Sequence, residues 1–267
     1  MSTDTVPATL LLAPRVNETG LQLRTAAGRR GLRAFTAPSW RAPAELVGGA
    51  VHLYGGPLFA DAVGGVFGLG LLEPAADWLV ALPRELTRRR VRFGTLAEAR
   101  ALRSPAFVKA PVDKHFAARV YRDGAGLPGP ELLDGDTPVL VSEVVRFASE
   151  FRLFVLDGAV RALSRYAVDG DLAVAAPGAE GPEVLAFAAE VLAAAAQVAP
   201  LPSAAVVDIG RTGHGWAVVE ANAAWASGGY ACDPDAVLDV VLRAGGPRDR
   251  LGAADLPFLR ELPAVEG

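Results

Sequence analysis

The chain has 267 residues, of which 51% are hydrophobic and 21% are charged, a composition typical of a globular protein with a sizeable core. Its formal net charge of −4 argues against a nucleic-acid-binding protein, which normally presents a basic face. The single cysteine, Cys232, excludes an intramolecular disulfide and a CxxC metal site.

The N-terminus lacks the basic and apolar stretches of a signal peptide. The most apolar predicted helix, Glu183 to Ala199, is interrupted by polar residues and is expected to be too short to span a bilayer. We therefore predict a cytoplasmic protein with neither a membrane nor a nucleic acid as partner. The sequence leaves the oligomeric state open.

The first part of the chain alternates predicted strands with helices. Strands are expected at residues 9–13, 33–36, 50–54 and 67–72, and a helix at residues 18–29. This alternation favours parallel strands covered by helices. We therefore predict an α/β domain over residues 1–90.

From about residue 106 the pattern changes to strands joined by tight turns. After a short strand ending at Lys109, strands are expected at residues 139–145, 150–156, 159–168, 204–209 and 216–221. A long helix is predicted at residues 182–198 and a final helix after Pro234, while a capping box at Thr95 and Glu98 predicts a short helix. Residues 91–267 are thus predicted to form an α+β domain, so that the fold class is α/β plus α+β.

Lysine is used at only two positions, Lys109 and Lys114, whereas the chain has 24 arginines. Lysine is a compact point charge that binds phosphate differently from the planar guanidinium of arginine. One ammonium at the end of a strand and a second in the next loop indicate a nucleotide-phosphate site. The alternative is chance in a composition rich in arginine.

Two carboxylates, Asp208 and Glu220, stand inside strongly apolar predicted strands. The turn near Gly213 makes these strands antiparallel and places Asp208 within one residue of facing Glu220. Asn222 projects from the same face as Glu220, because side chains alternate along a strand. Three oxygen donors at one patch suit Mg²⁺. The alternative is that the carboxylates are paired structurally, for example with Arg165 or Arg211.

Arg152 and Arg165 lie on consecutive predicted strands joined by an Asp-Gly turn, which brings them to the same region of a sheet. Arg152 stands among apolar residues and therefore needs an anion to accept its hydrogen bonds. A triphosphate or an acyl phosphate would supply one, and a structural pair with Glu150 or Glu143 is the alternative.

The order of these motifs resembles the ATP-grasp superfamily of carboxylate–amine ligases, and within it the clade named for two arginines and a lysine. The resemblance covers residues 90 to 243 and implies an ATP-grasp fold preceded by a pre-ATP-grasp α/β domain. It implies that Lys109 contacts the α- and β-phosphates of ATP and that Asp208, Glu220 and Asn222 hold Mg²⁺.

The resemblance also implies that the backbone of Glu143, Val144 and Val145 pairs with adenine and that Glu150 binds the ribose. Arg152 and Arg165 are the candidate arginines of the clade, and we expect both to be catalytic. The sequence departs from better-known ligases because no Gly- and Ser-rich phosphate loop follows Lys109. Lys114 is the candidate phosphate clamp and catalytic residue in its place.

The implied activity is ATP-dependent joining of a small-molecule or peptide carboxylate to an amine through an acyl phosphate. Two alternatives remain: an ATP-dependent phosphotransferase acting on a small molecule, and a non-catalytic nucleotide-binding module. A reactive thiol at Cys232 is a further hypothesis, although a lone cysteine beside a helix start is more often structural.

Overall fold

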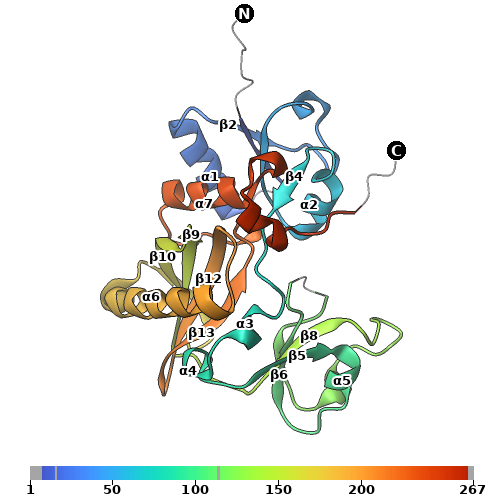
Figure 1. Ribbon diagram of the computed structural model, residues 1–267, viewed down its shortest axis with the longest axis vertical. Coiled ribbons are helices and arrows are strands. Elements are labelled where there is room, and N and C mark those ends of the chain that lie inside the picture. The colour runs from blue at the N-terminus through green and yellow to red at the C-terminus, as the bar shows by residue number, and fades with distance from the viewer. Residues whose placement is uncertain (1–7, 16, 113–114, 264–267) are drawn as a thin grey trace, which may run out of the picture.

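The computed structural model describes residues 8–15, 17–112 and 115–263, and within these residues the chain forms four β-sheets flanked by helices (Figure 1). A three-stranded sheet lies at one end of the molecule and a four-stranded sheet at the other, with a five-stranded sheet between them. The remaining two strands pair where the chain returns to its N-terminal part.

The N-terminal part alternates strands and helices as predicted. Its elements are β1 (Thr9–Leu12), α1 (Glu18–Arg29), β2 (Arg33–Thr36), β3 (Val51–Tyr54), α2 (Pro57–Val63) and β4 (Leu69–Leu71). The strands β2, β1 and β3 form a parallel sheet in that order, with every residue of the central strand β1 buried. Helix α2 was not predicted, and the expected strand at residues 67–72 is shorter than expected.

The four-stranded sheet carries the first predicted phosphate contact. It follows two short helices, α3 (Trp78–Ala81) and α4 (Arg84–Thr87), and contains β5 (Val91–Thr95), α5 (Leu96–Arg100), β6 (Ala106–Lys109), β7 (Arg119–Tyr121) and β8 (Pro138–Ser142). All its pairings are antiparallel, in the order β5-β8-β6-β7. The capping box of Thr95 and Glu98 is confirmed at the start of α5.

The five-stranded sheet is antiparallel, in the order β11-β10-β9-β12-β13. Its strands and their helices are β9 (Ser149–Leu156), β10 (Ala159–Val168), β11 (Asp171–Ala175), α6 (Gly181–Val198), β12 (Ala204–Thr212), β13 (Gly215–Asn222) and α7 (Pro234–Ala244). Side chains on one face, such as Phe151 and Val207, pack with α6. Side chains on the other face, such as Phe154 and Val206, pack with α7 and the N-terminal core.

Helix α6 is longer than the sequence suggested. A 3₁₀ turn precedes it, and the helical stretch Gly178–Val198 has 21 residues and is long and apolar enough, by length and composition alone, to cross a membrane. The prediction that it is too short is therefore wrong. Val184 and Val191 on α6 nevertheless belong to the same core cluster as β9 and β12, as expected of a helix that covers a sheet.

The C-terminal segment returns to the N-terminal part of the chain. Strand β14 (Gly245–Pro247) pairs antiparallel with β4, and Trp225, which precedes α7, is fully buried in the N-terminal core. Farther along, Arg260 forms ion pairs with Asp61 at 2.8 Å and Glu73 at 3.0 Å. The predicted domain limits, 1–90 and 91–267, remain predictions, and the last residues of the second range pack on the first.

Candidate active site

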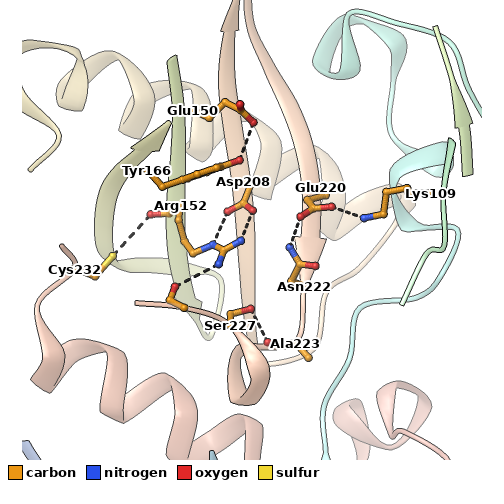
Figure 2. Close-up of polar contacts among 11 residues, drawn as sticks. Lys109, Glu150, Arg152, Tyr166, Asp208, Glu220, Asn222, Ala223, Ser227 and Cys232 are labelled. Atoms are coloured by element: carbon orange, nitrogen blue, oxygen red, sulfur yellow. Dashed lines mark hydrogen bonds and ion pairs between the residues drawn. The ribbon is translucent and has the colours of Figure 1, made fainter. Parts of the chain in front are cut away.

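A row of polar residues crosses the five-stranded sheet on the face opposite α6 (Figure 2). Ser164 of β10 lies opposite Arg152 of β9, which lies opposite Asp208 of β12, which in turn lies opposite Glu220 of β13. The expectation that Asp208 faces Glu220 to within one residue is confirmed. Neighbouring strands therefore bring a guanidinium and two carboxylates together inside an otherwise apolar sheet.

Arg152 and Asp208 form a bidentate ion pair. The Nε and Nη2 atoms of Arg152 donate to the two carboxylate oxygens of Asp208 at 2.9 and 2.6 Å, and Nη1 donates to the carbonyl of Gly228 at 3.3 Å. Asp208 is fully buried. Burial raises the pKa of Asp208 and Arg152 opposes this effect, so the charge of the carboxylate depends on its partner. Burial alone would lower the pKa of Arg152, but Asp208 outweighs it and raises that pKa.

This pair corrects two of the alternatives raised by the sequence. Asp208 is paired with Arg152 rather than with Arg165 or Arg211, and Arg211 instead donates to Glu183 at 2.6 Å on the surface. Arg152 finds its anion within the chain, in Asp208 rather than in a glutamate.

Two tyrosines cover the guanidinium of Arg152. The Arg152 Cζ atom lies 5.5 Å from the ring centroid of Tyr166 and 5.0 Å from that of Tyr230, and the two rings stack at 5.2 Å. The hydroxyl of Tyr166 donates to Glu150 at 2.8 Å. Burial, together with the carboxylates of Asp208 and Glu150, raises the pKa of Tyr166, so it remains a neutral donor. Burial likewise raises the pKa of Glu150.

Lys109 reaches Glu220 from the four-stranded sheet. Its ammonium pairs with Glu220 Oε2, while the side-chain amide of Asn222 donates to Glu220 Oε1 at 2.8 Å. Figure 2 shows Lys109 approaching from the neighbouring lobe toward the edge strand β13. Burial opposes ionisation of Glu220, but Lys109 and Asn222 hold its pKa below the ordinary value.

All five of these groups line one cavity of about 860 Å³, namely Lys109, Arg152, Asp208, Glu220 and Asn222. The same cavity is bounded by Pro57 and Leu58 of α2, by Trp78 of α3 and by Arg260 of the C-terminal segment. It therefore extends from the charged row to the N-terminal part of the chain, which leaves room for an organic substrate beside the charged groups.

Other predicted site residues lie elsewhere. The strand expected at residues 139–145 ends at Ser142, so Glu143, Val144 and Val145 form the connection between the two sheets, and they do not line the cavity. The Glu143 carboxylate accepts from the backbone N–H of Arg90 at 2.8 Å. Glu150 is also outside the cavity lining.

Arg165 lies in the expected region of the sheet but on the other face. It pairs with Phe151 across β9 and β10, whereas Arg152 pairs with Ser164. Arg165 therefore faces α6 rather than the cavity, and its catalytic role remains a prediction that its position does not support. Lys114 lies outside the described residues.

The tyrosines were missed because the sequence interpretation chose Arg165 over its neighbour. The alternation of β10 supplies the missing signal: if Ser164 shares a face with Arg152, the next residue on that face is Tyr166. Tyr230 carries no such signal, because it lies in a loop and adopts a left-handed backbone conformation with φ of 49°.

The oxygen donors suit a hard divalent cation in type, because two carboxylates and an amide carbonyl meet on adjacent strands. Both carboxylates are balanced by cations of the chain, so a metal ion would compete with Arg152 and Lys109. Among the described residues no group of three or more His, Cys, Asp or Glu side chains is arranged to hold a metal. The donor set therefore fits Mg²⁺ only if an amide and substrate oxygens complete it.

Comparison with known proteins settles the family. A sequence model of the ATP-grasp domain, family 2 of the clade named for two arginines and a lysine, matches residues 86–240. The chain belongs to this family. Membership places it in the ATP-grasp ligase superfamily and confirms the predicted fold and class of enzyme. ATP-grasp ligases use ATP and typically Mg²⁺.

Solved structures agree with this fold. A RimK domain protein ATP-grasp from Sphaerobacter thermophilus DSM 20745 is similar to this chain at 20% identity and a TM-score of 0.50, over 88% of this chain and 99% of that one. The D-cycloserine synthetase DcsG is similar at 16% identity and a TM-score of 0.50, over 88% of this chain and 98% of that one. No curated protein matches the chain.

Proposed function

We propose that the chain is an ATP-dependent ligase that joins a carboxylate to an amine, forming an amide or peptide bond through an acyl phosphate. The observation that carries this proposal is the shared cavity, in which Lys109, Arg152 and the three oxygen donors adjoin space that reaches the N-terminal part. A cavity limited to the charged row would hold nucleotide alone. This one also accommodates a small-molecule or peptide substrate.

The charged residues take distinct parts in this proposal. Lys109 releases Glu220 and binds the phosphates, while Glu220, Asn222 and Asp208 would hold Mg²⁺. The metal ion, when bound, supplies charge that offsets the negative charge of the triphosphate. Arg152 faces the same space and stabilises negative charge that develops during phosphoryl transfer.

The remaining predicted contacts surround this centre. The backbone of Glu143, Val144 and Val145 is proposed to pair with adenine, and Glu150 to bind ribose. The side chain of Glu150 is held by Tyr166, so ribose would replace or share that hydroxyl. Lys114 stays the proposed second phosphate contact.

The chemistry proceeds in two displacements. An oxygen of the substrate carboxylate attacks the γ-phosphorus, the bond from that phosphorus to the β,γ-bridging oxygen breaks, and ADP is formed together with the acyl phosphate. The amine nitrogen then attacks the acyl carbon, phosphate leaves and the nitrogen loses a proton. No side chain forms a covalent bond to substrate in this sequence, so positioning and electrostatics supply the catalysis.

A phosphotransferase is the second candidate, because the same cations and oxygen donors would serve transfer to a stable acceptor. The two activities differ in the fate of phosphate. A ligase releases ADP and inorganic phosphate with the amide, whereas a phosphotransferase leaves the phosphoryl group on its acceptor.

The test is an isotope-transfer assay. The protein is incubated with ATP, Mg²⁺, hydroxylamine as amine and a panel of amino acids and short peptides labelled with ¹⁸O in their carboxylates. A ligase gives a hydroxamate and inorganic phosphate carrying ¹⁸O, and Glu220→Gln gives neither. A stable phosphorylated acceptor without label in phosphate establishes the phosphotransferase. ADP release that no acid in the panel increases contradicts both.

A further inference from the structure

Arg89 is a buried guanidinium outside the charged row. It lies between α4 and β5 with an exposed fraction of 6%, and among the described residues it forms no ion pair. Its Nε donates to Ser142 Oγ at 3.2 Å and its Nη1 to the carbonyl of Thr87 at 2.9 Å. Buried arginines are normally matched with carboxylates, so this one calls for an explanation.

The other hydrogen bonds of Arg89 go to the edge of the five-stranded sheet. Nη1 donates to the carbonyl of Val218 at 2.6 Å and Nη2 to that of Val219 at 2.9 Å. Strand β13 is the last strand of that sheet, so carbonyls on its outer side have no partner strand. One side chain thus joins the outer edge of β13 to Ser142 at the end of β8.

The two carbonyls belong to an irregularity in the pairing of β12 and β13. Asp208 pairs with Glu220, but the next residue of β12, Ile209, pairs with Val218. Val219 is therefore an extra residue on β13, which makes this position a β-bulge. Arg89 binds the bulged residue and the residue before it.

The bulge decides which face of the sheet carries Glu220. In regular pairing Val219 would lie opposite Asp208, and Glu220 would lie opposite Val207, whose side chain packs with α6. A shift of one residue moves a side chain to the other face of a strand. The bulge therefore places Glu220 beside Asp208, in reach of Lys109 and the cavity.

We propose that Arg89 is a positioning residue that stabilises the bulge at Val219 and thereby keeps Glu220 and Asn222 on the cavity face. The guanidinium is suited to this task because its planar fork donates to two successive carbonyls at once. Burial lowers the pKa of Arg89 to about 10, with Glu220 and Glu150 opposing the effect, so the group is charged at neutral pH. The consequence for metal and nucleotide rests on the proposed function, whereas the consequence for the strand does not.

The test compares Arg89→Gln and Arg89→Lys with wild type and with Arg92→Gln, an exposed arginine of β5 that serves as the matched control. The first measurement is hydrogen exchange of residues 215–222 without nucleotide. We expect exchange there to become about tenfold faster in Arg89→Gln, with a smaller increase in Arg89→Lys and none in Arg92→Gln.

The second measurement is the Mg²⁺ concentration that gives half of the nucleotide-induced thermal shift. We expect it to rise by about tenfold in Arg89→Gln, because residues that orient metal ligands typically change affinity by that amount, while binding of ATP without metal changes little. A structural role alone would lower the melting temperature without moving this midpoint.

Exchange of residues 215–222 that stays within about twofold of wild type in a folded Arg89 variant overturns the inference. If Arg89→Gln does not fold, Arg89→Lys decides by the same criterion. If wild type shows no shift with ATP and Mg²⁺, the proposed function fails, and the exchange measurement still decides the inference about Arg89.

Discussion

At the scale of single residues, the site is organised by charges that balance one another. Arg152 neutralises Asp208, and Lys109 neutralises Glu220 across the gap between two sheets. Taking two charges out of water costs free energy that their attraction only partly returns, so such pairs are weak sources of stability. Their presence in a cavity is better explained by the binding of a polyphosphate.

Replacing Lys109 by methionine tests its contact with phosphate. The substitution keeps a long apolar stem and removes the ammonium, and we expect the affinity for a non-hydrolysable ATP analogue to fall about 10- to 100-fold, the range for a lost charge-assisted hydrogen bond. Isothermal titration calorimetry measures this, with Arg103→Met, an exposed cation on the same lobe, as control. Equal affinities of the Lys109 variant and wild type would remove Lys109 from the site.

A double-mutant cycle tests the buried pair. Arg152→Met and Asp208→Leu each leave one buried charge without its partner and should each lower the free energy of unfolding by about 3–5 kcal/mol. The double variant should lose less than either single variant, because no buried charge remains. Urea unfolding measures the three values. Losses that simply add would show that the two side chains act independently.

The thiol of Cys232 should be inert in the folded protein. It is buried, and burial raises its pKa to about 12, so at pH 8 only about one thiol in ten thousand is ionised. We expect no fast reaction with a thiol reagent at pH 8 until denaturant is added, after which one thiol per chain reacts. Rapid labelling of native protein would restore the hypothesis of a reactive cysteine.

At the scale of elements, helix α7 connects the site to the N-terminal core. Its N-cap residue Asp233 accepts hydrogen bonds from the backbone N–H groups of Asp235 at 2.9 Å and Ala236 at 3.0 Å. Pro234 occupies the first turn, where its missing N–H costs nothing. The start of the helix is thereby fixed directly after the loop that carries Tyr230.

Substituting the cap gives a local stability test. Asp233→Ala should lower the free energy of unfolding by about 1 kcal/mol, because two N–H groups of the first turn lose their acceptor. Asp233→Asn should change it by only a few tenths of a kcal/mol, since the amide oxygen also accepts these bonds. Denaturant unfolding compares the two. Similar losses in both variants would mean that the charge of Asp233, not its capping, matters.

Most elements could be predicted from the sequence because their signals are local. Helix α1 and strands β2 and β10 begin and end at the predicted residues, where hydrophobic periodicity and turn residues agree. Strand β11 and strand β14 were missed, since each depends on a partner elsewhere in the fold. The pairing of Asp208 with Glu220 followed from the turn between them.

The rest of the site required information that local patterns do not carry. The bulge at Val219 and the pairing of Arg152 with Asp208 depend on the register of strands, which tertiary packing sets. The contact of Lys109 with Glu220 joins residues of different sheets. The face on which Arg165 lies also depends on register, and a shift of one residue was enough to mislead the sequence interpretation.

At the scale of the whole molecule, the cavity lies where three parts of the chain meet. The four-stranded sheet supplies Lys109, the five-stranded sheet supplies the charged row, and the N-terminal part with the C-terminal segment closes the far end (Figure 1). Strand β14 and Arg260 tie that last segment to the N-terminal part. The arrangement allows a nucleotide to contact two sheets at once and leaves the third wall for substrate.

The most direct test of this account is the Mg²⁺ dependence of binding of a non-hydrolysable ATP analogue, measured by calorimetry on wild type and Glu220→Gln. Wild type should bind at least about tenfold more tightly with Mg²⁺ than without it, and Glu220→Gln should lose most of that gain while keeping its metal-free affinity. Equal dependence on Mg²⁺ in the two proteins, or no binding by wild type, would contradict the account.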